Sequence, residues 1–141
     1  MDAFGMAGHW IRRLHQHSTA VFTQRMQRSG IELTPVQFAT LAAISAAPGS
    51  DQAAIAECIG YDRATIGGVV ERLEKKGWVD RTVSEQDRRA RVLTLSQAGR
   101  ALYAKALPLA HELQADILQP LSPDEREVFI SLARRVTQAN N

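Results

Sequence analysis

The sequence predicts a mostly α-helical fold with one small β-hairpin. Apolar residues recur at helical spacing near both ends of the chain, within residues 8–28 and 97–137. Two short segments in the middle each follow an aspartate and are joined through Gly60, which is typical of two consecutive short helices. Two runs rich in β-branched residues, 78–83 and 91–95, flank a charged stretch, as the strands of a hairpin do.

The first two helices are predicted from their apolar spacing and their end signals. The first is expected over residues 8–28 and stops at Gly30, because glycine readily adopts the left-handed conformation that ends a helix. The second is expected to begin at Pro35, a residue that suits the first helical turn. Thr34 and Gln37 have the spacing of a capping box, which supports this start.

The middle of the chain has the pattern of a winged helix-turn-helix. Asp51 and Asp62 are expected to cap short helices over residues 52–59 and 63–76, with Gly60 in the turn between them. The hairpin follows directly, and residues 84–90 form its charged tip. The order helix, turn, helix and charged hairpin is that of a winged helix-turn-helix lobe.

Two further helices are predicted after the hairpin. Ser96 is expected to cap a long helix over residues 97–119, about 34 Å in length at about 1.5 Å per residue. Pro108 lies inside this helix, where a proline is expected to kink it. Ser122 and Glu125 form a second capping-box pattern at the start of the last helix. Its inward face is expected to carry Val128, Phe129, Leu132 and Val136.

The length of 141 residues suits a single domain, residues 1–141. Within it we expect a DNA-binding lobe at about 34–96 and dimerisation helices at about 8–29 and 97–139. The three terminal helices have more apolar surface than one small lobe needs to cover. A two-fold homodimer buries such surface and places two DNA half-sites about 34–36 Å apart.

Composition bounds the class and the compartment of the protein. The chain is 45% hydrophobic and 23% charged, with a formal net charge of +2, which permits nucleic-acid binding without indicating it. No apolar run has the length of a membrane span, and the first residues lack the pattern of a secretory signal. The single cysteine, Cys58, excludes an internal disulfide and fits the reducing cytoplasm.

The helix after Asp62 is predicted to read DNA. The second helix of the pair enters the major groove, so its first residues must be small or able to bond to bases. Two glycines in a helix cost about 1 kcal/mol each and are best explained by close approach of the backbone to DNA. The predicted contact residues are Asp62, Arg63, Ala64, Thr65, Gly67 and Gly68, with Arg63 and Thr65 as hydrogen-bond donors.

The hairpin tip carries the sequence Asp87-Arg88-Arg89. An arginine at such a tip can enter the minor groove, where the negative potential attracts it. Asp87 is predicted to orient Arg89 through a charge-assisted hydrogen bond. The alternative is a loop that is charged only because it is exposed to solvent.

The chain resembles the multiple-antibiotic-resistance regulator (MarR) family along nearly its whole length. The matching stretches are residues 33–38 (LTPVQF), 62–65 (DRAT), 70–79 (VERLEKKGWV), 87–89 (DRR) and 93–100 (LTLSQAGR). The resemblance implies a triangular dimer held by the first and last two helices. It also implies that the dimer binds a palindromic operator, usually as a repressor that a small ligand releases.

The resemblance also assigns roles to individual residues. Residues 62–68 would read the major groove, and Asp87 and Arg89 would form the wing tip. Arg72 would lie near the phosphate contacts of the recognition helix, or it would pair with Glu71 or Glu74.

A ligand site is predicted on the first helix. His9, Arg13 and His17 repeat every four residues and share one helical face, and Trp10 lies beside His9 in the sequence. An arginine with histidines against aromatic walls suits a small aromatic carboxylate, the effector class expected here in place of a cofactor. The alternative is that this helix packs in the dimer with its histidines partly exposed.

Two other kinds of sensor are less consistent with the sequence. His9, His17, His111 and Glu112 could surround zinc, but their spacing matches no metal motif. Redox sensing through Cys58 is disfavoured, because this cysteine lies in the first helix of the reading pair and most lone cysteines are small apolar fillers.

Two other functional classes remain as alternatives. An enzyme is disfavoured because the sequence has no glycine-rich phosphate loop, nucleophile elbow or paired-cysteine metal motif. A helical adaptor that does not bind DNA is disfavoured by the retained Arg63, Thr65 and Arg89.

Overall fold

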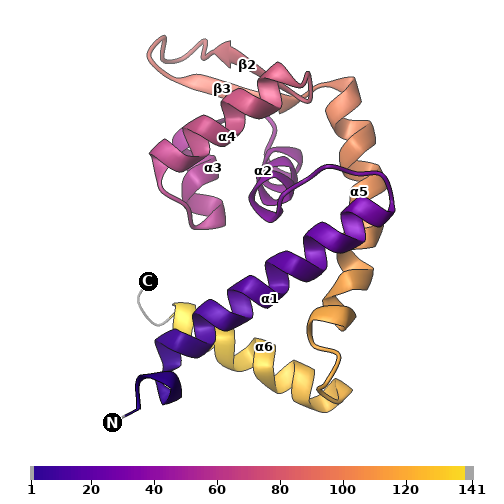
Figure 1. Cartoon of the computed structure of the whole chain (residues 1–141). Coiled ribbons are helices and arrows are strands. Elements are labelled where there is room, and N and C mark those ends of the chain that lie inside the picture. The colour runs from indigo at the N-terminus through magenta and orange to yellow at the C-terminus, as the bar shows by residue number, and fades with distance from the viewer. Residues whose placement is uncertain (1, 139–141) are drawn as a thin grey trace.

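The computed structural model describes residues 2–138, and these form the predicted mostly helical fold, with a small hairpin at one edge of the molecule (Figure 1). The helices are η1 (Ala3–Gly5), α1 (Ala7–Arg28), α2 (Pro35–Ala46), α3 (Gln52–Ile59), α4 (Arg63–Lys75), α5 (Gln97–Ile117) and α6 (Pro123–Gln138). The strands are β1 (Ser50–Asp51), β2 (Val79–Val83) and β3 (Arg91–Leu95). The short η1 and β1 were not predicted; the other elements were, with ends that agree within two residues.

The predicted caps determine where the helices begin. The Thr34 hydroxyl accepts the Gln37 N–H at 3.2 Å and the Gln37 side chain accepts the Thr34 N–H at 3.1 Å, so the capping box of α2 is confirmed. The same exchange joins Ser122 and Glu125 at the start of α6. Gly30 has a φ of +72°, the left-handed conformation expected of a glycine after a helix.

The sheet has three antiparallel strands in the order β1-β3-β2. The register pairs Val79 with Leu95, Arg81 with Leu93 and Val83 with Arg91. Strand residues alternate between two faces, so these six residues share one face of the hairpin. Val79, Leu93 and Leu95 are buried, which identifies this face as the one that packs on the core.

One continuous hydrophobic core connects the hairpin lobe to the long helices. It runs from α4 and β3 through α2 and reaches Phe22 and Met26 on α1 and Leu113 on α5. The rings of Phe22, Phe38 and Tyr103 follow one another at centroid distances of 5.8 and 5.7 Å, and these three aromatics join α1, α2 and α5. Figure 1 shows α2 inside the molecule, with α1 and α5 crossing beside it.

The start of α5 is joined tightly to the end of α4 and the start of β2. The Ser96 hydroxyl donates to the Gly77 carbonyl at 2.5 Å, and the Ser96 N–H donates to the Trp78 carbonyl. Gly99 lies directly against Trp78, because a Cβ at Gly99 would come within 1.9 Å of the Trp78 oxygen. The helix α5 continues through Pro108 to Ile117.

The prediction that the apolar side chains of α6 face inward is wrong for a single chain. Val128, Leu132 and Val136 are 58%, 49% and 68% exposed, and α6 has no buried residue. Trp10 and Ile11 on α1 are also more than half exposed. Figure 1 shows that α1 and α6 lie on the side of the molecule away from the hairpin. Within residues 2–138, this apolar surface is covered only in part.

Among the described residues, no helix combines the length and the apolar character needed to cross a lipid bilayer.

Candidate nucleic-acid interface

The helix-turn-helix is formed by α3 and α4, as predicted. Asp51 caps α3 by accepting the Ala54 N–H at 2.8 Å. Gly60 ends α3 with a φ of +77°, a conformation that few other residues adopt at low cost. Asp62 then caps α4, so the turn between the two helices is only three residues long.

Asp62 and Thr65 are engaged with each other at the start of α4. One carboxylate oxygen of Asp62 accepts the Thr65 N–H at 2.7 Å, and the other accepts the Thr65 hydroxyl at 2.8 Å. These bonds, the backbone bond first, lower the pKa of the Asp62 carboxyl. Thr65 was predicted to donate to DNA, but its hydroxyl proton is already donated to Asp62. Its oxygen remains an acceptor on an exposed side chain.

The rest of the predicted reading surface on α4 is open to solvent. Arg63, Ala64 and Gly68 are exposed. The inward face of the helix is formed by Ile66, Val69, Val70 and Leu73, all of which are buried. The two glycines differ in their surroundings, since a Cβ at Gly67 would come within 3.1 Å of Gln52 Nε2, whereas a Cβ at Gly68 would meet nothing within 4 Å.

Arg72 is exposed and forms no ion pair with its neighbours on the helix. Glu71 pairs instead with Lys75 at 3.6 Å, and Glu74 pairs with Arg81 of β2 at 3.1 Å. Of the two roles considered for Arg72, pairing with these glutamates is therefore absent from the described structure. Its guanidinium is left available to other partners.

The wing tip is shaped by hydrogen bonds to its backbone. The Ser84 hydroxyl accepts the N–H groups of Gln86 and Asp87, both at 3.2 Å. The Asp87 carboxylate accepts the Arg89 N–H at 3.0 Å, while it lies 3.7 Å from Arg89 Nε. Asp87 thus holds the Arg89 backbone, and its contact with the guanidinium is a loose ion pair in place of the predicted hydrogen bond. The Arg89 side chain is 96% exposed, and Arg88 is exposed beside it.

A basic hollow separates the start of α4 from the wing. It has a volume of about 310 Å³ and is lined by Gln52, Ala53, Arg63, Arg81, Arg89, Ala90 and Arg91. The structure thus brings together two predicted DNA contacts, Arg63 and Arg89, which are distant in the sequence. Arg81 and Arg91 are not among the predicted DNA contacts. Their signal was the strand alternation, which places two arginines on the face that otherwise carries Val79, Leu93 and Leu95.

The residues predicted to bind an aromatic acid do not form a closed site in one chain. His9 and Arg13 line an open hollow of about 620 Å³, whose lining comes entirely from α1. Trp10 stacks edge-on with His9 at 5.2 Å between ring centroids. His17 points elsewhere, because its Nε2 lies 2.8 Å from the Ile117 carbonyl at the end of α5. One chain therefore supplies one charged side of a binding site and leaves the opposite side open.

The rival metal site does not form among residues 2–138. No group of three or more His, Cys, Asp or Glu side chains gathers there in an arrangement that could hold a metal ion. Glu112 instead pairs with Arg25 at 2.5 Å, and this ion pair joins α5 to α1. Cys58 is exposed near the end of α3, so the expectation of a buried apolar filler is wrong.

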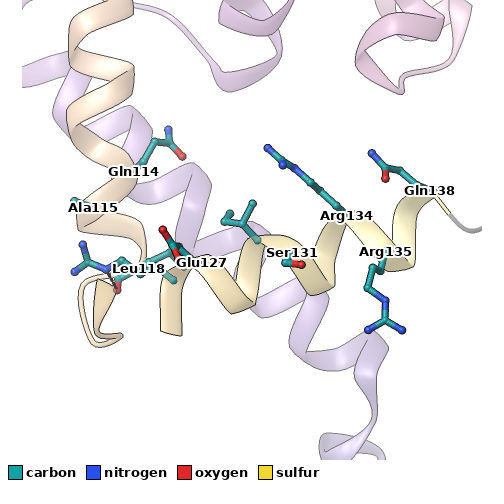
Figure 2. A pocket seen from close by; sticks show the side chains of 10 residues that line it. Gln114, Ala115, Leu118, Glu127, Ser131, Arg134, Arg135 and Gln138 are labelled. Carbon is teal, nitrogen blue, oxygen red and sulfur yellow. Dashed lines mark hydrogen bonds between the residues drawn. The ribbon is translucent and has the colours of Figure 1, made fainter. Parts of the chain in front are cut away.

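A larger hollow, about 760 Å³, lies between the end of α5 and α6 (Figure 2). Figure 2 shows Gln114 of α5 and Arg134 and Gln138 of α6 extending into the same open space. Arg126, also in its lining, is engaged in donating to the carbonyls of Leu118 and Leu121. None of the residues predicted to bind an aromatic acid lines this hollow.

Comparisons with known proteins give a consistent picture. Residues 31–90, which span α2 to the wing, match the model of the MarR family. The chain is 33% identical to the transcriptional regulator HosA of Escherichia coli O157:H7, over 92% of this chain and 93% of HosA. It is 32% identical to the HTH-type transcriptional repressor NicR of Pseudomonas putida, over 99% of this chain and 87% of NicR.

Solved structures resemble the whole chain as well. The transcriptional regulator PcaV of Streptomyces coelicolor, crystallised with its natural ligand, is 34% identical, with a TM-score of 0.89 over 100% of this chain and 98% of PcaV. BpsR of Bordetella bronchiseptica, whose DNA binding is regulated by 6-hydroxynicotinic acid, is 29% identical, with a TM-score of 0.89 over 97% and 96% of the two chains. The repressor CouR, bound to a DNA duplex, is 29% identical, with a TM-score of 0.84 over 97% and 99%.

Proposed function

Because this chain belongs to the MarR family, we propose that it is a cytoplasmic transcription regulator that binds a palindromic operator as a homodimer. It represses the adjacent genes until a small aromatic acid releases it. The relatives are named as regulators or repressors of transcription and not as enzymes, which supports a regulatory role.

The observation that carries the proposal is the single basic surface formed by α4 and the wing. Arg63 at the start of α4 and Arg89 on the wing line the same hollow, and the α4 surface beside it carries the small residues Ala64 and Gly68. A helix with small exposed residues can enter the major groove, and an exposed arginine on a hairpin can enter the neighbouring minor groove. The repressor CouR, whose fold is similar, is bound to a DNA duplex in its structure.

The exposed apolar residues of α1 and α6 support the homodimer. Leu132 and Val136 of α6 and Ile11 and Leu14 of α1 line one open apolar hollow of about 390 Å³. Contiguous apolar surface of this kind is expected at a protein interface. A second copy related by a two-fold axis covers the same residues on both chains and presents two recognition helices to one palindrome.

The proposed effector is supported by a relative and by the charge of α1. BpsR responds to 6-hydroxynicotinic acid, a small aromatic acid. In this chain, Arg13 supplies a cation that suits a carboxylate, and His9 lines the same hollow with Trp10 stacked against it. His17 belongs to the proposed set of residues but is bonded to the Ile117 carbonyl in a single chain. The proposed dimer would have to supply the rest of the enclosure, because one chain leaves the hollow open.

The test is a gel shift of the purified protein on its own upstream intergenic DNA at controlled salt, with and without a panel of aromatic acids. Specific binding that one acid releases supports the whole proposal. The affinity is expected to fall steeply with salt, because each phosphate contact releases counterions. Binding that no acid changes would leave a ligand-independent regulator. The absence of DNA binding at every salt concentration would favour the alternative of a helical adaptor that does not bind DNA.

The Arg13 assignment has its own test. Benzoate-like acids are expected to bind the wild type more tightly than the Arg13→Ala variant, because Arg13 is the cation proposed to hold the carboxylate. Equal affinities would remove Arg13 from the effector site and leave the regulator itself in place.

A further inference from the structure

Two arginines, Arg81 and Arg91, lie on the face of the hairpin that packs on the core. The register places them on the same side as Val79 and Leu95, although residues on that side are expected to be apolar. Arg81 pairs with the buried Leu93, Arg91 pairs with Val83 at the open end of the hairpin, and both arginines line the hollow beside α4. Their position therefore places two cations beside the start of the recognition helix.

Arg81 is held in place by Glu74 of α4. Its Nη2 lies 3.1 Å from Glu74 Oε1, and its side chain is only 30% exposed. A partly buried guanidinium is costly unless it is paired. Glu74 accepts one hydrogen bond from the group, and a guanidinium has five N–H donors. Arg81 is thus oriented by its contact with Glu74, and its remaining N–H donors can bind a second acceptor.

The hollow has an excess of positive charge. Its lining includes the guanidinium groups of Arg63, Arg81, Arg89 and Arg91 and no carboxylate. Glu74 and Asp87 lie outside the lining and pair with one arginine each. Cations gathered in this way repel one another, and the repulsion is relieved when an anion binds among them.

The position of the hollow identifies the anion. A helix in the major groove and a wing in the adjacent minor groove lie on opposite sides of one sugar–phosphate strand, since that strand separates the two grooves. The hollow lies between these two elements. We propose that it binds the DNA backbone phosphates between the grooves, with Arg81 and Arg91 as phosphate-binding residues and Glu74 as the residue that positions Arg81. This inference rests on the proposed function.

The test measures how affinity depends on salt. Fluorescence anisotropy would follow Arg81→Gln and Arg91→Gln binding to two short labelled duplexes, one of arbitrary sequence and one from the upstream intergenic DNA. Each variant is expected to lose affinity on the order of tenfold, by the same factor on both duplexes. The slope of log affinity against log KCl is expected to fall by about 0.9 for each lost contact. The control is Lys105→Gln, which removes one charge from the exposed surface of α5 and is expected to preserve the slope.

Two further variants separate a phosphate contact from a structural role. Arg91 is exposed and forms no ion pair within residues 2–138, so Arg91→Gln is expected to leave thermal unfolding unchanged. Arg81→Lys keeps the charge but loses the planar group that can contact Glu74 and a phosphate together. It is expected to restore the salt slope and only part of the affinity.

The outcomes distinguish this inference from the proposed function. If the wild type binds neither duplex at any salt concentration, the proposed function fails and the inference fails with it. If the wild type binds and both glutamine variants retain its affinity and salt slope, the proposed function stands and only the assignment of the hollow to backbone phosphates is excluded. A calorimetric titration with inorganic phosphate gives the last arm. Phosphate binding that Arg91→Gln abolishes, together with unchanged DNA affinity, would overturn the backbone assignment in favour of a free anion.

Discussion

Arg81 and Arg89 lie on the same hairpin but are held in different ways. Arg81 is half-buried and pairs with Glu74, whereas the Arg89 side chain is 96% exposed, with Asp87 acting mainly on its backbone. An exposed side chain loses conformational freedom when it binds, and its removal leaves the folded chain unchanged. The two arginines therefore call for different experiments, and Arg89 gives the cleaner one.

Replacing Arg89 by alanine is expected to weaken operator binding on the order of tenfold, because one charge-assisted contact in the minor groove is lost. Anisotropy or gel shift on the upstream intergenic DNA measures this. The oligomeric state, followed by sedimentation, is expected to stay the same, since the hairpin that carries Arg89 lies on the side of the molecule away from α1 and α6 (Figure 1). An unchanged affinity would remove the wing from the mechanism.

Asp62 makes the stability of the protein depend on pH. Its hydrogen bonds to Thr65 lower its pKa in the folded state. A group with a lowered folded pKa stabilises the protein above its unfolded value of about 3.9, and this stabilisation is lost as the pH falls through the folded pKa. Asp62→Asn keeps a good capping residue without the titration. The stability of the wild type relative to Asp62→Asn, from urea unfolding, is therefore expected to fall below about pH 5. A constant difference across this range would contradict the assignment.

Some site residues could be predicted from the sequence and others could not. Asp62 and Thr65 were identified because a cap and its helix are neighbours in the sequence. The direction of the Thr65 hydroxyl was missed, because it depends on a rotamer and on Asp62 as a competing acceptor. Arg81 and Arg91 were missed because their shared face depends on the pairing register of two strands.

At the scale of elements, the two glycines of α4 form a matched pair. Gly68→Ala is expected to raise the free energy of unfolding by up to about 1 kcal/mol, because alanine favours helix and its Cβ meets nothing within 4 Å. Gly67→Ala is expected to stabilise less, since its Cβ lies 3.1 Å from Gln52 Nε2. Urea unfolding measures both variants.

DNA affinity is expected to change in the opposite direction to stability for Gly68→Ala, because the added methyl group lies on the surface proposed to enter the major groove. If Gly68→Ala is more stable than the wild type and binds DNA equally tightly, then the backbone at Gly68 does not closely approach DNA. Gly67, half-buried beside α3, would then be the glycine with a structural requirement.

The helix ends were predictable at this scale because each depends on a few neighbouring residues, such as Asp51 or Ser96. The strand β1 was not, since two residues are too few to show an alternating pattern and β1 exists only through its pairing with β3. The exposure of α6 was missed for another reason. Apolar spacing shows that a face will be buried, but it does not say whether the burying surface belongs to the same chain.

At the scale of the whole molecule, the long helix α5 connects the surfaces proposed for dimerisation and for DNA binding. Ser96 and Gly99 at its start are held against Gly77 and Trp78, which follow the recognition helix. His17 of α1 lies against the far end of the same helix. An effector that binds DNA-competent and DNA-incompetent positions of α5 with unequal affinity would therefore change the spacing of the recognition helices in the proposed dimer.

This coupling requires a dimer, and Leu132 tests it. Leu132 is 49% exposed on α6 and belongs to the apolar hollow shared with α1, so a carboxylate there would be desolvated when two copies associate. Leu132→Glu is expected to raise the dimer dissociation constant by at least about tenfold, measured by analytical ultracentrifugation. The monomer is expected to remain folded, because Leu132 is outside the core. The control Gln97→Glu adds the same charge to an exposed position at the start of α5.

DNA binding by the Leu132→Glu variant distinguishes a loss of dimerisation from a loss of fold. A folded monomer carries one recognition helix and one wing, so it is expected to bind a palindrome and an isolated half-site with similar, weak affinity. The wild-type dimer is expected to prefer the palindrome strongly, because the second half-site is bound at a high effective concentration. If Leu132→Glu stays dimeric and keeps this preference, the apolar surface of α1 and α6 is not the interface. The two half-sites must then be brought together by a different part of the molecule.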